Sequence, residues 1–144
     1  MHSTIKPLKT GIAKGLSIVY DMVKVIVPCY IGIELMKHFG LIEIISRLFR
    51  PFMKLFGLPG EAALGLIAGY FINLYAAIAV LTPLNLSGRQ ITIMALILGI
   101  SHSLPIETSV TQKTGVSWAV LLGARIGLSL ISGVFVNIVW TFFS

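Results

Sequence analysis

Long apolar segments without charged residues occupy much of the chain and predict helices that cross a membrane. Residues 62–88 form 27 consecutive positions without a charged side chain, residues 126–144 form 19 and residues 90–106 form 17. A membrane-spanning helix needs about 20 mostly apolar residues, so the first two segments qualify and the third is short. Residues 16–39 are a weaker candidate because charged residues interrupt them. The pattern predicts an all-α integral membrane protein.

Residues 41–57 show a different, amphipathic pattern. Polar side chains at spacings of three, four, seven and eleven share one narrow helical face, namely Glu43, Ser46, Arg47, Arg50 and Lys54. The opposite face is apolar and rich in phenylalanine. A basic, aromatic-rich helix of this kind is typical of the membrane interface, with its cations toward the lipid headgroups. Pro51 is expected to kink or break it.

These patterns predict one membrane domain with about four membrane helices and one interfacial helix. Its segments are a basic, surface-lying lead-in (1–15), a first membrane helix (16–39), the interfacial helix (41–57), a second membrane helix (61–82), a broken third helix (88–114) and a last membrane helix (116–143). Ser87 with Gln90 predicts a capping box at the start of the third helix. The pairs Gly65/Gly69 and Gly123/Gly127 provide small-residue faces for close helix packing.

Polar residues cluster where the third helix loses its apolar character. The sequence there is Ser101-His102-Ser103-Leu104-Pro105-Ile106-Glu107-Thr108, and proline favours the first turn of a new half-helix. Transporters use such breaks near the bilayer midplane to hold polar substrates, and the free carbonyls of the first half suit a cation or a donor group. Alternatively, the helix ends at His102 and an ordinary interfacial loop follows.

Seven polar residues are candidates for solute binding: Asn73, His102, Ser103, Glu107, Thr108, Gln112 and Arg125. Glu107 would lie in the first turn of the second half-helix, where the positive end of the helix dipole favours an anion. Arg125 either faces inward and pairs with Glu107 or extends unpaired to the interface. Asn73 either reaches the cavity or bonds a neighbouring helix.

Composition narrows the function further. Hydrophobic residues make up 56% of the chain and charged residues 11%, against roughly 25% charged in soluble domains, which disfavours a soluble enzyme. The formal net charge is +6, and the basic residues lie between apolar segments. This placement favours anionic lipids over nucleic acid as the binding partner. Because the sequence shows no nucleophile–base pair and no metal-ligand spacing, we expect neither an enzyme nor a cofactor.

Two motifs resemble a known family. Gly57-Leu58-Pro59-Gly60-Glu61-Ala62-Ala63, followed by an apolar helix and then the 101–108 motif, is similar to the nucleoside-recognition or gate domain family. That family includes the spore maturation proteins A and B and the gate domains of the ferrous-iron transporter. The resemblance begins near Leu16 and implies a transport-type helical unit. Where the iron transporter's gates have a cysteine before the asparagine, this sequence has Ile72 before Asn73.

Together these observations predict a half-size transporter or gate unit of the cell inner membrane, with several membrane passes. It would bind a small polar solute, with a nucleoside as one candidate, at the break in the third helix. The alternative is a non-transporting assembly partner of a larger membrane complex. Basic residues on the two sides of the first helix are nearly equal in number, so we expect a homodimer of antiparallel copies or a heterodimer with a homologous gate protein. Its interface would follow Gly65/Gly69 or Gly123/Gly127.

Overall fold

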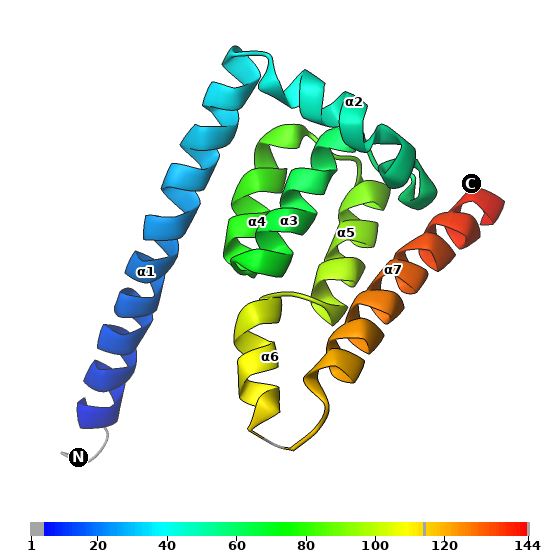
Figure 1. Cartoon of the computed structure of the whole chain (residues 1–144). Coiled ribbons are helices and arrows are strands. Elements are labelled where there is room, and N and C mark those ends of the chain that lie inside the picture. The colour runs from blue at the N-terminus through cyan, green and yellow to red at the C-terminus, as the bar shows by residue number, and fades with distance from the viewer. Residues whose placement is uncertain (1–4, 114, 144) are drawn as a thin grey trace.

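The computed structural model describes residues 5–113 and 115–143, and every regular element among them is a helix (Figure 1). The elements are α1 (Ile5–His38), α2 (Leu41–Met53), η1 (Lys54–Phe56), η2 (Gly60–Ala62), α3 (Ala63–Phe71), α4 (Leu74–Leu81), η3 (Thr82–Leu84), α5 (Gly88–Ile100), α6 (Leu104–Gln112) and α7 (Trp118–Phe143), where η marks a 3-10 helix. By length and composition, Pro7–His38, Gly88–Gln112 and Trp118–Phe143 are long enough to span a membrane. The prediction of an all-α membrane protein is confirmed.

The first helix is longer than predicted. A separate lead-in was expected up to residue 15, but α1 is continuous from Ile5, through Pro28, to His38. Pro7 lies in its first turn, where a proline removes no helical hydrogen bond, so this residue is compatible with the early start. Its 34 residues extend about 51 Å, which exceeds the roughly 30 Å of a bilayer core. Residues 1–4 lie outside the described part of the chain.

The amphipathic helix α2 has three faces. Ile42 and Met53 are buried against the rest of the protein, and the charged residues form a second, exposed face. The third face is apolar yet exposed and consists of Leu41, Ile44, Leu48 and Phe52, and Leu55 of the following η1 is also exposed. The expected break at Pro51 is absent: α2 continues to Met53, and the chain turns only at Gly57, whose φ is 66°. Pro51 lies so near the helix end that only two α-helical residues follow it.

The predicted second membrane helix is wrong in its form. Residues 61–82 fold into a hairpin, in which α3 and α4 lie side by side and a break at Ile72–Asn73 separates them (Figure 1). Asn73 starts α4, because its Oδ1 accepts a hydrogen bond from the Ala76 amide at 2.8 Å. With nine and eight residues, each arm is about 13 Å long or shorter and cannot cross a bilayer alone.

Gly65 and Gly69 of this hairpin are in close contact with other helices of the same chain. A Cβ atom at Gly65 would lie 2.3 Å from the Leu81 side chain, and one at Gly69 would lie 2.4 Å from Leu98. These contacts pack α3 against α4 and α5, so the Gly65/Gly69 face is not available for the expected dimer interface. At Gly123 and Gly127, in contrast, a Cβ would meet no atom within 4 Å among the described residues.

The third helix is broken as predicted. The capping box begins α5. The backbone N–H of Gln90 donates to Ser87 Oγ at 3.4 Å, and the backbone N–H of Ser87 donates to the side-chain Oε1 of Gln90 at 2.9 Å. The helix ends at Ile100, and α6 begins at Leu104 with Pro105 in its first turn. The predicted segment 88–114 therefore consists of two half-helices, and α7 packs along α5.

The main core lies where the end of α2, the hairpin and α5 meet. Its buried members are Met53, Phe56, Leu58, Ala62, Ala63, Leu66, Ala77, Ile93, Met94, Ile97 and Leu98. A smaller cluster joins α1 to α4 through Ile33, Ala76 and Val80. The core thus holds both helix breaks in fixed positions relative to each other.

The turn between α2 and α3 depends on a close backbone approach at Gly60. A Cβ there would lie 2.0 Å from the carbonyl oxygen of Ser46, which α2 holds rigidly. We expect Gly60→Ala to lower the free energy of unfolding by roughly 1–3 kcal/mol, as overpacking does. Gly99→Ala is the matched control, because its Cβ meets no described atom within 4 Å. Thermal unfolding in detergent would measure both, and equal melting temperatures would contradict the close approach.

Candidate functional site

The break between α5 and α6 is short and anchored to the hairpin. Ser101 has an extended backbone and Ser103 a left-handed one, with φ 47°. The Ser103 amide donates a hydrogen bond to the Gly69 carbonyl at 2.8 Å. Because Gly69 lies just before the break at Ile72–Asn73, the two helix interruptions lie close together. At this break the protein itself supplies a hydrogen-bond partner for a backbone group that the helix leaves free, as irregular backbone at membrane depth requires.

Three ionisable side chains meet at the break. Glu107, in the first turn of α6, forms an ion pair with Arg125 Nη1 of α7. His102 Nε2 lies 3.6 Å from the other carboxylate oxygen of Glu107. The prediction that Arg125 faces inward and pairs with Glu107 is therefore confirmed, and the unpaired alternative is wrong. Glu107 is 32% exposed and Arg125 24%, so a ligand can still reach the pair.

The guanidinium of Arg125 also closes the end of α5. Its Nε and Nη2 donate to the Ile100 carbonyl at 3.3 and 3.2 Å. The last carbonyls of a helix lack partners within the helix and carry the negative end of its dipole. Arg125 thus lies between the negative end of one half-helix and the carboxylate of the next, and it joins α5, α6 and α7.

The imidazole of His102 has a defined orientation. Its Nδ1 lies 2.9 Å from the Leu98 carbonyl, which can only accept, so Nδ1 carries the proton of this bond. Nε2 is left facing Glu107. His102 is 32% exposed, as Glu107 is, and these two groups form the accessible edge of the cluster.

The remaining candidates lie around this cluster rather than in it. The Asn73 side chain caps α4, and it bonds that helix rather than Glu107. Ser103 lies within the break itself, where its backbone amide bonds the Gly69 carbonyl. Thr108 is half-buried and Gln112 is exposed farther along α6, and neither bonds to the cluster in the described part of the chain.

Sequence reasoning did not select two serines that the structure places behind the break. Ser101 is fully buried, and its Oγ has no hydrogen-bond partner among the described residues. Ser129 is also fully buried and shares a hydrogen bond of 3.0 Å with the Tyr70 hydroxyl. The position of Ser101 within the polar motif was a signal, whereas no local pattern distinguished Ser129 from the other small residues of α7.

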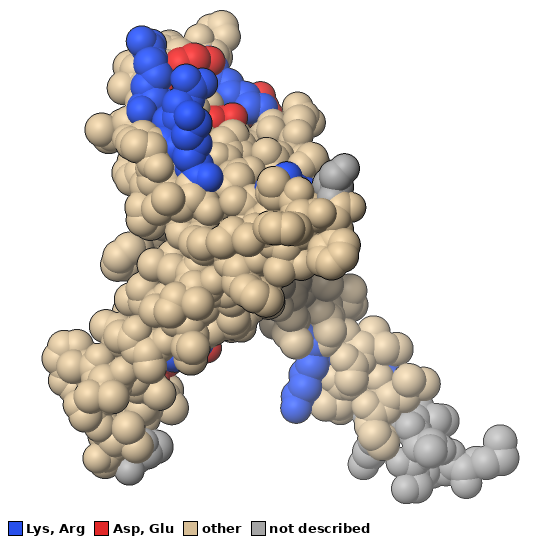
Figure 2. All heavy atoms as spheres, turned by 90° about the vertical axis from the view of Figure 1, so that its right-hand side faces the viewer, with Lys and Arg blue, Asp and Glu red and all other residues tan. Residues whose placement is uncertain are grey.

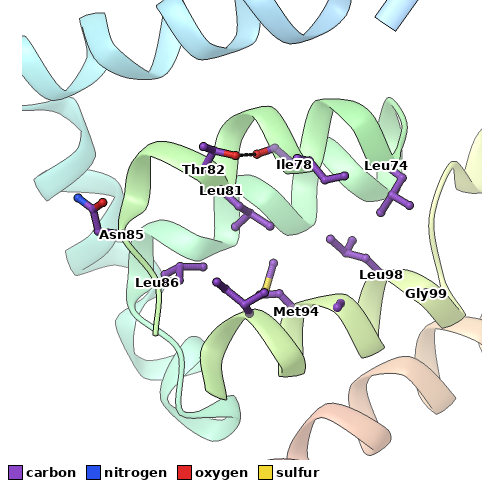
Figure 3. Close-up of a pocket in the computed structure, with 11 residues that line it drawn as sticks. Leu74, Ile78, Leu81, Thr82, Asn85, Leu86, Met94, Leu98 and Gly99 are labelled. Carbon is purple, nitrogen blue, oxygen red and sulfur yellow. Dashed lines mark hydrogen bonds between the residues drawn. The ribbon is translucent and has the colours of Figure 1, made fainter. Parts of the chain in front are cut away.

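An apolar cavity lies on the other side of α5. It measures about 570 Å³ and opens between α4 and α5 (Figure 3). Leucine, isoleucine and methionine side chains form most of its lining, with Thr82 and Asn85 at one end. Leu98 connects the two regions, because its side chain lines the cavity while its carbonyl holds His102. The cavity itself is suited to apolar groups and not to a charged solute.

The fold and the cluster define a helical membrane protein with a charged site at a helix break. Comparison with protein families shows which family the chain is related to. The model of the Gate family, described as nucleoside recognition, matches residues 19–117. The chain belongs to this family, as the two motifs indicated.

One curated relative is an uncharacterized membrane protein, YvoD, of Bacillus subtilis (strain 168). It is 39% identical to this chain over 130 residues, which cover 90% of the chain and 42% of the relative. The chain therefore spans less than half the length of that protein. No solved structure matches the chain.

The Arg125–Glu107 pair should contribute to stability through mutual compensation. Arg125→Gln leaves a partly buried carboxylate unpaired, and we expect a loss of about 2 kcal/mol in the free energy of unfolding. The double variant with Glu107→Gln should be about 1 kcal/mol more stable than the sum of the single effects predicts. Denaturant unfolding in detergent would measure this coupling, with Lys9→Gln on the exposed part of α1 as control. Additive effects would show that the pair does not hold the break.

Proposed function

We propose that this protein is a transporter or gate unit that binds a small polar solute at the break between α5 and α6. The observation that carries the proposal is the accessible carboxylate of Glu107, held between Arg125 and His102 beside irregular backbone. A carboxylate in hydrocarbon costs on the order of 2.5–3.5 kcal/mol on insertion scales, so function or pairing must offset that penalty. A helix break with free polar groups is the usual transporter arrangement for solutes and ions.

The chemistry of the cluster suits a solute with hydroxyl or amino donors. Glu107 would accept hydrogen bonds from the solute, with His102, Ser103 and Thr108 completing the polar contacts. Asn73 and Gln112 would form the periphery, and Arg125 would pair with the carboxylate while the site is empty. A nucleoside carries such hydroxyl and amino groups, and the family's description supports it as the first candidate.

We place the protein in the cell inner membrane as a multi-pass unit that works with a second copy or a homologous gate protein. The Gly123/Gly127 face of α7 supports this, because a Cβ there would meet no described atom within 4 Å and small residues allow another helix to approach closely. The same face favours the second candidate function, a non-transporting assembly partner. Uptake of a radiolabelled nucleoside by proteoliposomes of the purified protein would favour transport, and binding without uptake would favour the assembly role.

Replacing Glu107 by Gln keeps the shape of the side chain and removes its charge. Hydrogen bonds to a charged group contribute about 1.5–3 kcal/mol, so the affinity for uridine or adenosine should fall roughly 10- to 100-fold. Ligand-induced thermal stabilisation of the purified protein would measure this. Glu43→Gln, on the exposed face of α2, is the control and should bind as the wild type does. Wild-type affinity in Glu107→Gln would show that Glu107 serves only the structure of the break.

The antiparallel dimer predicts two orientations in the membrane. A cysteine at Ser3, in a Cys29→Ala background, should react with a membrane-impermeant maleimide from both sides. Ser3 lies outside the described residues, so this test depends only on which side the N-terminal end faces. Labelling from one side alone would exclude antiparallel copies and leave a parallel oligomer or a differently oriented partner protein.

A further inference from the structure

A charged groove lies between α2 and the turn formed by residues 57–61. Figure 1 shows α2 at the end of the molecule away from α6. It consists of two adjoining hollows of about 440 and 380 Å³. Both hollows are lined by Ser46, Arg50 and Glu61, and Lys54 lines the larger one. This groove contains the glycine-rich motif that the proposed solute site does not use.

Two cations of the groove have no protein partner in the described part of the chain, whereas Arg47, which lines the smaller hollow, donates to the Glu43 carbonyl at 3.4 Å. Arg50 of α2 and Lys54 of η1 are exposed, and neither forms an ion pair or a side-chain hydrogen bond within residues 5–113 and 115–143. Lys and Arg side chains gather at this end of the molecule, with acidic side chains among them (Figure 2). Two neighbouring cations, one of them a guanidinium, suit a phosphate group.

The opposite wall carries a carboxylate. Glu61 Oε2 accepts a hydrogen bond from Ser46 Oγ at 2.6 Å, and no cation pairs with Glu61 in the described part of the chain. A simple anion bound to Arg50 and Lys54 would also lie near this negative charge. A ligand with a phosphate and a primary ammonium group would satisfy both walls at once.

The walls of the groove keep a fixed separation. Gly60 lies directly against the backbone of Ser46, and Glu61 is tied to the Ser46 side chain. These contacts hold the backbone of the turn against α2, while the side chains of Arg50 and Lys54 stay exposed and unpaired among the described residues. The groove is prepared for a ligand that carries both charges.

We propose that this groove binds the phosphoethanolamine headgroup of a membrane lipid. The phosphate would bind Arg50 and Lys54, and the ammonium group would donate to Glu61. A lipid is favoured over a free phosphate compound because α2 and η1 also present exposed apolar side chains at Leu48, Phe52 and Leu55, along which an acyl chain can lie.

Thermal stabilisation of the detergent-purified protein by added lipid tests the proposal. Phosphatidylethanolamine should bind roughly fivefold more tightly than phosphatidylglycerol, which lacks the ammonium group. Phosphatidylcholine should be weakest, because its quaternary ammonium has no N–H to donate. Soluble phosphoethanolamine at the same concentration should have little effect. Equal stabilisation by all three lipids would overturn the proposal, and equal stabilisation by soluble phosphoethanolamine would identify a free phosphate compound as the ligand instead.

Variants assign the two walls. Arg50→Gln with Lys54→Gln should abolish the response to both phosphatidylethanolamine and phosphatidylglycerol. Glu61→Gln retains an acceptor for Ser46 and should remove only the preference for phosphatidylethanolamine. Lys9→Gln with Lys14→Gln, both exposed on α1, is the charge-matched control for the Arg50/Lys54 variant. An unchanged preference in Glu61→Gln would refute the assigned ammonium contact, and if that variant fails to fold, an unchanged response in the Arg50/Lys54 variant refutes the site.

Discussion

The broken helix depends on the contacts that the guanidinium of Arg125 makes with the Ile100 carbonyl and with Glu107. The break ends one helix with carbonyls that have no partner within it and begins the next with a carboxylate, so negative charge collects at one place. In apolar surroundings such groups must be satisfied within the protein. Arg125 donates to Ile100 and pairs with Glu107 from a third helix. The free carbonyls at this helix end could have bound a cation from a solute, but Arg125 already fills that role. A solute that binds Glu107 must therefore share the carboxylate with Arg125 or displace Arg125 from it.

The same constraint explains why the two breaks lie together. The Ser103 amide lost its helical partner and uses the Gly69 carbonyl at the end of α3 instead. Asn73 supplies the cap for α4 that an uninterrupted helix would not need. Each interruption therefore uses polar groups of its own or of its neighbour. Polar chemistry stays on one side of α5, while the apolar cavity occupies the other.

Local signals made part of this structure predictable. Ser87 and Gln90 bond each other across one turn, and Pro105 favours a first helical turn, so the start of each half-helix followed from a short pattern. The hairpin at Asn73 did not, because 27 uncharged residues have the length of a span and one asparagine is a weak signal against it. The direction of Arg125 also depends on tertiary packing, which places α7 beside the break.

The most direct test of the central claim is where a solute lies when it binds. A photoreactive nucleoside, cross-linked to the protein in proteoliposomes and mapped by mass spectrometry, would report this position. The account predicts adducts on residues 101–108, beside Glu107, and loss of those adducts when excess uridine competes. Adducts confined to the apolar lining between α4 and α5, or adducts that uridine does not displace, would contradict it.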